Sequence, residues 1–343
     1  MNIKEIDKIF ITNLPAFYKI NLFNEIAKKE NIHVIFTGNT AEMRNNDFFK
    51  TQLINFPYTD LSKKSKISKT LIFLKFFFNR SYSEVIIGGW DEWLMWLALF
   101  LSPRRKNSAI VESSIYESSI VGTKAFFKKI FFKKISKVYA SGKNQTKLVY
   151  SLKFKGAVIE TKGVGIFNIR NQPPFIGREK IKNFLYVGRL ATEKNVSRLI
   201  EVFNQMPEFE LHVVGFGPLE NDLKNLAENN IRFHGAIKNE ELYRLYSKYD
   251  VFILPSTIEP WGLVVEEALN NGMPVIASNK VGCVGEVLID NFNGMVFNSD
   301  DMLSLKEKIS QISIPDNYNY LRENISKMDF KKIALSQTNA YLS

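Results

Sequence analysis

The sequence is 343 residues long, with 45% hydrophobic and 24% charged residues, which is ordinary for a folded protein and enough for two domains. Its single cysteine, Cys283, excludes a disulfide framework and is typical of a reducing compartment. The opening MNIKEIDKIFITNL has charges where an export signal needs an apolar core. The longest apolar run, residues 93–101, is about half as long as the ~20 residues of a transmembrane helix. We therefore expect a cytoplasmic protein in which this run is a buried helix.

The charge is distributed unevenly along the chain. The formal net charge is +11, but residues 1–165 contain 27 Lys and Arg against 13 Asp and Glu, whereas residues 166–343 contain 19 against 22. The first half is strongly basic and the second is slightly acidic, which indicates two units with different partners. We expect the basic half to face something anionic.

In the first half, short apolar runs alternate less clearly with helical segments than in the second. We expect strands at residues 9–14, 32–38, 84–89, 108–113 and 137–142. The Pro and Gly of residues 168–180, NIRNQPPFIGREK, mark a linker.

In the second half the alternation is regular. We expect strands at residues 183–188, 210–215, 231–235, 251–256, 274–278 and 294–298, with helices between them and a further helix from Ser299. This order predicts an α/β protein with two doubly wound, Rossmann-like domains that face each other across a cleft. We expect residues 1–168 to form the first domain and residues 169–320 the second, with residues 321–343 as a helix that returns to the first domain.

Loops after parallel strands are where such sheets bind ligands, and three of them carry suitable groups. After residues 183–188, Arg189 and Lys194 lie beside a helix N-terminus, a combination that suits a phosphate. After residues 210–215, Gly215 lets the backbone approach a ligand closely. Surface cations and a plain turn are the alternatives for these two loops.

The third loop lies in residues 255–278, PSTIEPWGLVVEEALNNGMPVIAS, and carries two separated carboxylates, Glu259 and Glu267. The helix is expected to begin near Gly262, so its first amides point back at the ligand. Those amides belong to Gly262, Leu263 and Val264. Glu266 is about 100° from Glu267 around the helix and should face elsewhere. Carboxylates here suit sugar hydroxyls; the alternative is a helix cap at Glu259 and a solvated Glu267.

Together the three loops, in the order GRLATEKN, VGFGP and PSTIEPWGLVVEEALNNGMPVIAS, resemble the donor half of glycosyltransferase family 4. The following VGCVGEVLIDNFNGMVF matches the next segment of that family, so the resemblance is strong over residues 183–298 and weaker before them. It implies the GT-B fold, with residues 1–168 as the acceptor-binding domain and residues 169–320 as the nucleotide-sugar-binding domain. It also implies retention of configuration at the sugar. It also implies transfer of a hexosyl or N-acetylhexosaminyl group from a nucleotide-diphosphate sugar, with UDP or GDP as the carrier, and with no separate cofactor.

The resemblance also implies roles for individual residues. Arg189 and Lys194 would neutralise the diphosphate, Glu259 would contact the donor sugar, and Glu267 would hold the ribose. The remaining donor-binding positions are Gly188, Gly215, Gly262, Leu263 and Val264. The chain has no D-x-D pair, so no metal site is implied.

The acceptor side is less defined, because the first half departs from the family pattern. The family's G-V-D after the last strand of this half reads G-V-G here, and Gly165 removes its carboxylate. The three histidines lie in predicted strands, where structural roles are expected. Asp91 and Glu112 follow predicted strands and are the acceptor-side candidates; a helix cap and a polar strand end are their alternatives.

Two stretches of the basic half combine lysine with aromatic residues, at 63–80 and 124–137. A helix packed on the sheet with extended lysines is one interpretation, and binding to an anionic membrane is the other. Nucleic acid is not expected as a partner, because the chain lacks a recognition motif. We expect the lysines to contact a membrane, and we expect some of the phenylalanines to be buried and others exposed.

We therefore expect a retaining glycosyltransferase, peripheral on the inner face of the cell membrane, that acts on a lipid-linked or surface-glycan acceptor. The alternatives are a soluble glycosyltransferase for a small molecule or protein, and a non-catalytic nucleotide- or glycan-binding protein on the same scaffold.

Overall fold

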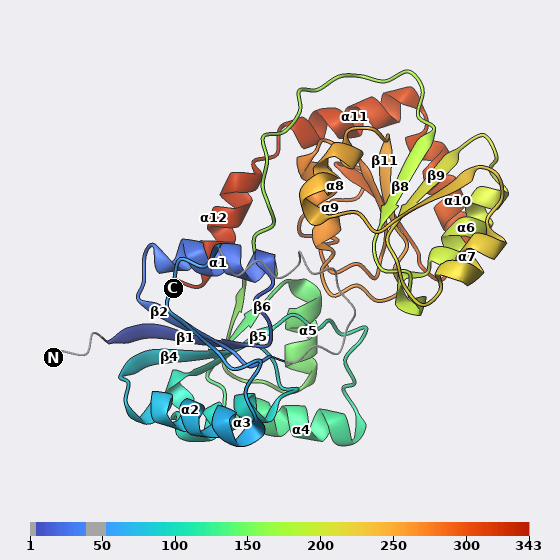
Figure 1. The fold of residues 1–343 in the computed structure, drawn as a ribbon. Coiled ribbons are helices and arrows are strands. Elements are labelled where there is room, and N and C mark those ends of the chain that lie inside the picture. The colour runs from blue at the N-terminus through green and yellow to red at the C-terminus, as the bar shows by residue number, and fades with distance from the viewer. Residues whose placement is uncertain (1–4, 39–52, 343) are drawn as a thin grey trace. The chain divides into compact units, whose positions relative to one another are not determined.

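The computed structural model describes residues 5–38 and 53–342, and the chain divides into two compact units (Figure 1). The first unit contains the residues up to 166 together with 332–343, and the second contains residues 167–331. The chain passes from the first unit to the second at the start of the segment that the sequence marks as a linker. Residues 168–182 contain no helix or strand.

The first unit is built on a seven-stranded parallel sheet in the order β3-β2-β1-β4-β5-β6-β7. Its strands are β1 (Ile6–Thr12), β2 (Ile32–Phe36), β3 (Tyr58–Asp60), β4 (Tyr82–Ile87), β5 (Asn107–Val111), β6 (Lys137–Ala140) and β7 (Ala157–Glu160). Its helices are α1 (Phe17–Ala27), α2 (Lys66–Phe78), α3 (Trp93–Leu101), the 3-10 turn η3 (Arg104–Lys106), α4 (Gly122–Lys133), α5 (Lys143–Ser151) and the end of α12 (Phe330–Ala340). The short edge strands β3 and β7 were not predicted.

Alternate residues of the central strands face two different helix layers. Ile9 and Ile11 belong to the apolar cluster formed with α2, α3, α4 and α5. Phe10, between them, packs on Phe23 of α1, with ring centroids 4.6 Å apart. On that second face Tyr341, just after α12, stacks on Tyr139 of β6 at 4.6 Å. The end of the chain therefore completes the core of the first unit.

The second unit is built on a six-stranded parallel sheet in the order β10-β9-β8-β11-β12-β13. Its strands are β8 (Asn183–Val187), β9 (Glu210–Val214), β10 (Ile231–Gly235), β11 (Val251–Leu254), β12 (Val275–Ser278) and β13 (Gly294–Phe297). Its helices are the 3-10 turn η4 (Thr192–Lys194), α6 (Val196–Asn204), α7 (Glu220–Leu226), α8 (Asn239–Tyr246), α9 (Leu263–Asn270), α10 (Met302–Ile312) and α11 (Pro315–Ser326).

Most predicted elements of the second unit appear where the sequence placed them, with one shift. The helix expected from Ser299 begins at Met302, because Asp301 caps it: the Asp301 carboxylate accepts hydrogen bonds from the amides of Leu303 and Ser304. The helix α11 follows directly and was not predicted.

Both sheets are doubly wound, as the sequence predicts. In the first, the strand order reverses between β1 and β4, and in the second between β8 and β11. At such a reversal the loops after the two central strands diverge to opposite faces and leave a crevice at the carboxyl edge, where ligands bind. No helix among the described residues is both long and apolar enough to cross a membrane.

Candidate active site

The loops after β8 and β11 are joined to each other at the strand reversal of the second sheet. The backbone carbonyl of Glu193 accepts hydrogen bonds from the amides of Thr257 (2.9 Å) and Ile258 (3.4 Å) and from the Thr257 hydroxyl (3.2 Å). The Asn195 side chain donates to the carbonyl of Pro255 at 3.3 Å. These bonds hold the loop that carries Arg189 and Lys194 against the loop that carries Glu259.

The three residues predicted to be catalytic lie in these joined loops, and each charge already has a partner. Lys194 Nζ lies 2.5 Å from Glu259 Oε2, and Arg189 lies 2.5 Å from Glu193 Oε1. Burial would raise the pKa of Glu193, but hydrogen bonds from its own backbone and from Arg189 outweigh it and lower that pKa. The sequence analysis missed Glu193, although its spacing of four from Arg189 is the signal of a short-range ion pair.

Glycine at position 215 is required by the packing of the loop after β9 against Gly188 in the loop after β8. Gly215 has φ of +144°, and a Cβ added there would lie 1.8 Å from the carbonyl oxygen of Gly188. The two backbones are therefore in direct contact. This contact between the loops accounts for glycine at position 215. The sequence alone suggested a different reason, which was a close approach of the backbone to a ligand.

The helix α9 begins one residue after Gly262, which is its left-handed N-cap. The amides at the start of a helix lack intrahelical acceptors, and here the first of them comes three residues after Glu259. They belong to Gly262, Leu263 and Val264. The structure therefore brings a helix N-terminus, a carboxylate and two cations to one edge of this sheet.

The two neighbouring glutamates of α9 face different surroundings. Glu267 is partly buried and accepts a hydrogen bond from the Tyr246 hydroxyl of α8 at 3.2 Å. Burial raises the pKa of Glu267 to about 7. Glu266 is turned into the core, where the indole N–H of Trp261 donates to its Oε1 at 2.6 Å.

In the first unit, the acceptor-side candidates have different environments. Glu112, directly after β5, pairs with Lys19 of α1 at 2.9 Å, and Lys19 also reaches the Thr12 hydroxyl at 3.4 Å. Asp91 is exposed in the loop after β4, and Glu92, the next residue, is the N-cap of α3. The sequence did not single out Lys19, although it lies in the helix that follows the first strand.

Gly165, where the family pattern has a carboxylate, sits against the backbone of α1. A Cβ there would lie 2.6 Å from the Tyr18 ring and 2.7 Å from the Tyr18 carbonyl oxygen, and φ is +150°. A side chain cannot fit without moving the helix. This packing explains why the chain has glycine at the position.

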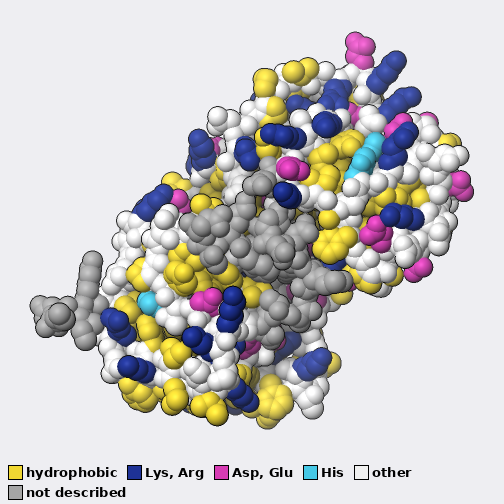
Figure 2. Space-filling model, viewed as in Figure 1, with side chains coloured by type: hydrophobic (Ala, Val, Ile, Leu, Met, Phe, Trp, Pro, Cys, Tyr) yellow, Lys and Arg dark blue, Asp and Glu magenta, His cyan; other side chains and the backbone are white. Residues whose placement is uncertain are grey.

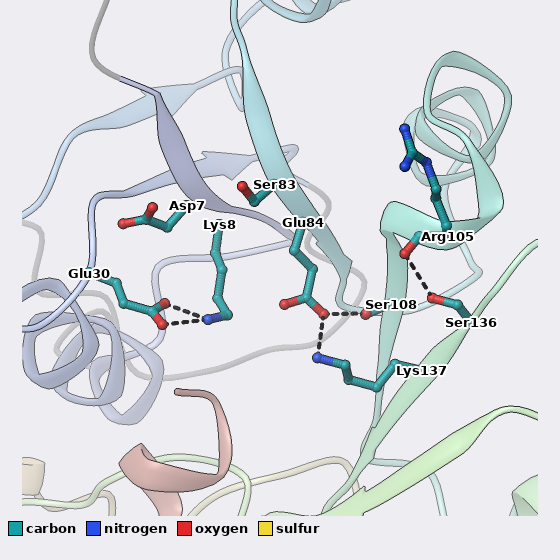
Figure 3. A pocket seen from close by; sticks show the side chains of 9 residues that line it. All are labelled: Asp7, Lys8, Glu30, Ser83, Glu84, Arg105, Ser108, Ser136 and Lys137. Atoms are coloured by element: carbon teal, nitrogen blue, oxygen red, sulfur yellow. Dashed lines mark hydrogen bonds and ion pairs between the residues drawn. The ribbon is translucent and has the colours of Figure 1, made fainter. Parts of the chain in front are cut away.

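A pocket of about 380 Å³ opens at the opposite, amino edge of the first sheet (Figure 3). Its charges are largely paired with each other: Lys8 contacts both carboxylate oxygens of Glu30 at 2.7 and 2.5 Å. Glu84 accepts a hydrogen bond from the Ser108 hydroxyl and forms an ion pair with Lys137 at 3.3 Å. The pocket lies away from the loops that follow the strands, so it is separate from the acceptor-side candidates.

The described residues contain no group of three or more His, Cys, Asp and Glu side chains arranged to hold a metal. The histidines contact other side chains of the sheets: His33 bonds to Thr59 at 2.9 Å, and His212 bonds to His234 at 3.0 Å. Burial lowers the pKa of both His33 and His212 to about 4.

Comparison with known proteins gives the site a context. Residues 168–328 match the family described as Glycosyl transferases group 1. A segment of 122 residues is 34% identical to the sulfoquinovosyl transferase SQD2 of Arabidopsis thaliana, covering 34% of this chain and 24% of that protein. A segment of 188 residues is 30% identical to the O-antigen biosynthesis glycosyltransferase WbnH of Escherichia coli, covering 54% of this chain and 53% of that protein.

Solved structures match over nearly the whole chain. The lipopolysaccharide outer core galactosyltransferase WaaB, in its apo form, aligns with a TM-score of 0.70 at 16% identity, over 98% of this chain and 99% of that one. Anabaena HepE in complex with UDP and glucose aligns with a TM-score of 0.70 at 18% identity, over 96% and 98%.

Glycosyltransferases thus match this chain in sequence within residues 168–328 and in fold over nearly its whole length. At these identities the solved structures establish the fold, which is the predicted two-domain GT-B architecture. The matched segments span only a quarter to about half of the length of these two curated relatives. The similarity in sequence is concentrated in the second unit, where the predicted donor site lies.

Proposed function

We propose that this chain is a retaining glycosyltransferase of family 4 that transfers a hexosyl or N-acetylhexosaminyl group from a nucleotide-diphosphate sugar. One observation carries the proposal: Arg189, Lys194 and Glu259 meet at the start of α9, at the carboxyl edge of the second sheet. Cations beside a helix N-terminus suit a diphosphate, and a carboxylate next to them suits the hydroxyls of a sugar.

The ion pairs of the site indicate how a donor would bind. A diphosphate near Arg189 and Lys194 would compete with the carboxylates that now neutralise them, Glu193 and Glu259. Release of Glu259 from Lys194 frees its oxygens to accept hydrogen bonds from the sugar. The two cations and the first amides of α9 then stabilise the negative charge that develops on the leaving diphosphate, and no metal ion is required.

The names of similar proteins support a carbohydrate acceptor that is part of a larger glycan. WbnH is described as an enzyme of O-antigen biosynthesis, and WaaB as a galactosyltransferase of the lipopolysaccharide outer core. We propose a lipid-linked or surface-glycan acceptor for this chain, with UDP or GDP as the nucleotide of the donor. HepE, which has the same fold, binds UDP and glucose.

On the acceptor side, Glu112 is the first candidate, because an ion pair with Lys19 fixes its position. The pair follows the strands β5 and β1, at the edge of the first sheet where a doubly wound unit binds ligands. We propose that Glu112 contacts an acceptor hydroxyl and that Lys19 orients Glu112. Asp91, which is exposed in the loop after β4, is the second candidate.

We further propose that the first unit docks on an anionic membrane, at the inner face of the cell membrane. Apolar side chains on the outer layer of helices, which we call the docking surface, are exposed. They are Ile67, Leu71 and Phe78 of α2, Phe100 of α3, and Phe126 and Phe127 of α4. Lysines contact this layer, with Lys66 over the ring of Trp93 and Lys134 over the ring of Phe100. Figure 2 shows hydrophobic and basic side chains side by side along the lower rim of this unit.

Two lysines of the stretch 124–137 do not belong to this surface, which corrects the sequence analysis. Lys128 is buried against Trp90 and donates to Ser118 at 2.5 Å, and burial lowers its pKa. Lys137 starts β6 and pairs with Glu84. The remaining lysines of the stretch are available to attract anionic lipid headgroups, each by about 1 kcal/mol when close to the surface.

A panel of nucleotide sugars tests the enzymatic proposal. A nucleotide sugar present far above its Kd raises the melting temperature, and incubation with the bound donor should release the nucleoside diphosphate slowly through hydrolysis. Binding without hydrolysis or transfer to any glycan would favour the non-catalytic alternative. Transfer to soluble acceptors, without recovery of the protein on anionic vesicles in a flotation assay, would favour the soluble glycosyltransferase.

A further inference from the structure

The loop that carries Glu259 is fastened from inside the protein by a residue of the helix that follows it. Glu266, in the first turn of α9, is 1% exposed, and Trp261 is 2% exposed. The Trp261 indole N–H donates to Glu266 Oε1 at 2.6 Å. Trp261 lies between Glu259 and Gly262, the N-cap of α9.

The other side of the same loop is held by backbone hydrogen bonds. The amide of Gly282 donates to the carbonyl of Glu259, and the amide of Cys283 donates to the carbonyl of Trp261, both at 2.9 Å. The loop is therefore fixed at its backbone by residues 282–283 and at its largest side chain by Glu266. The backbone of Glu259 therefore cannot shift unless one of these attachments gives way.

We propose that Glu266 is a positioning residue of the donor site, whose buried carboxyl holds Trp261 and, through it, the loop that presents Glu259 and the first amides of α9. This inference rests on the proposed function. It gives Glu266 a structural role without contact to substrate, separate from the ribose contact expected of Glu267.

The surroundings of Glu266 favour its uncharged form. Its second oxygen, Oε2, is buried and has no hydrogen-bond partner among the described residues. The titratable groups that face it are Glu267 on the same helix and Cys283 on the segment after β12, and neither supplies a positive charge. Burial raises the pKa of Glu266 to about 8, although the bond from Trp261 lowers it in part. An ionised carboxylate here would be an unpaired charge in the core.

The sign of the pH dependence follows from this raised pKa. Between the ordinary value of 4.5 and about 8, the folded state binds a proton that the unfolded state has lost. The contribution of Glu266 to stability therefore falls as pH rises through this window and is constant above it. Above pH 8 the carboxyl ionises in the folded protein, and the core has to rearrange around the charge.

The first arm of the test uses the protein without ligand. E266Q keeps an acceptor for Trp261 and stays neutral, so its melting temperature should rise relative to wild type between pH 5 and pH 8 and then stay level. E201Q, at an exposed glutamate of α6, is the control and should show a constant difference. At pH 6.5, the double variant W261F/E266L should lose less free energy of unfolding than the two single variants lose together, because both changes remove the same contact. A constant difference for E266Q, or additivity of W261F and E266L, would overturn the proposal.

The second arm measures UDP binding, with GDP as the second nucleotide. We expect the loop to be held only when Glu266 is neutral. The ratio of the wild-type Kd to the E266Q Kd should then be about tenfold larger at pH 9 than at pH 6.5. Comparing the two proteins at each pH removes titration of the nucleotide and of Glu267. A ratio independent of pH, with the first arm as expected, would make Glu266 a core residue only. If wild type binds neither nucleotide while the first arm succeeds, the donor site itself is rejected and the contact of Glu266 with Trp261 stands.

Discussion

The two units share one topology and differ in where their polar groups are concentrated. In the second unit, the charged residues of the site lie in two loops that are bonded to each other at the strand reversal. In the first unit, the equivalent edge has the pair of Glu112 and Lys19, and the distinctive feature is an outer helix layer with exposed phenylalanine and lysine. The same doubly wound arrangement thus carries a candidate binding site in its loops in one unit and a proposed docking surface on its helices in the other.

The sharpest test of the helix layer separates buried from exposed phenylalanines of α4. Phe131 is fully buried in the core cluster, whereas Phe126 and Phe127 are 60% and 58% exposed. F131A should lower the free energy of unfolding by about 3–5 kcal/mol because it leaves a cavity. F126A and F127A should change it little and should weaken recovery on anionic vesicles. Denaturant unfolding checks the first effect; equal losses in all three variants would mean that this face is packed.

The next largest effect concerns the loop after β8. R189A and K194A should each lower kcat/KM, because each removes a preorganised charge that faces the leaving diphosphate. The expected loss of transition-state stabilisation is roughly 2–4 kcal/mol for each variant. R198A, at an exposed position of α6, is the matched control and should be neutral. EDTA should have little effect on the wild-type rate. Loss of activity with EDTA and its recovery with a divalent cation would contradict the metal-independent arrangement.

The two glutamates on either side of α9's first turn should affect different kinetic constants. E267A should mainly weaken nucleotide binding, because a ribose is held alike in the ground and transition states. E259A should mainly lower kcat, because its contacts lie on the sugar, where charge develops. Each loss should be about 1.5–3 kcal/mol, as for hydrogen bonds to charged groups. Equal losses of free-nucleotide affinity in both variants would show that these roles are wrongly assigned.

The smallest effect for each residue is expected at the lysines of the docking surface. Changing Lys124, Lys133 and Lys134 to Gln should weaken binding to anionic vesicles by about 1 kcal/mol per lysine, and less at high salt. The control changes three exposed lysines of the same unit outside this surface, Lys147, Lys153 and Lys155, with the same loss of charge. If both triple variants lose the same affinity in a flotation assay, net charge alone attracts the membrane, and the proposed surface has no special role.

The sequence by itself placed the strands of the second unit and the loops that carry the residues of its candidate site. Buried parallel strands are continuous apolar runs, and their loops follow them directly, so periodicity places Arg189, Lys194 and Glu259 at one edge. The same logic failed for β3 and β7, because edge strands of three or four residues leave no apolar run to detect. The return of the chain to the first unit was predicted over residues 321–343, whereas the structure places α12 at Phe330–Ala340 and only residues 332–343 in that unit. The packing of Tyr341 on Tyr139 joins residues about two hundred positions apart, which no local pattern shows.

Only the tertiary structure decided which charges are free and which are buried. The sequence treated Lys128 and Lys137 as members of one basic stretch, yet one is buried beside Trp90 and the other pairs with Glu84. It placed Glu266 on the side of the helix away from the ligand. The helical period gives only this direction and does not show that the Trp261 indole N–H donates a hydrogen bond to Glu266. The desolvation of a carboxyl group and its hydrogen-bond partner depend on chain segments that meet only on folding. For this reason the pattern of residues could locate the site, and only the packed structure could show what holds it in shape.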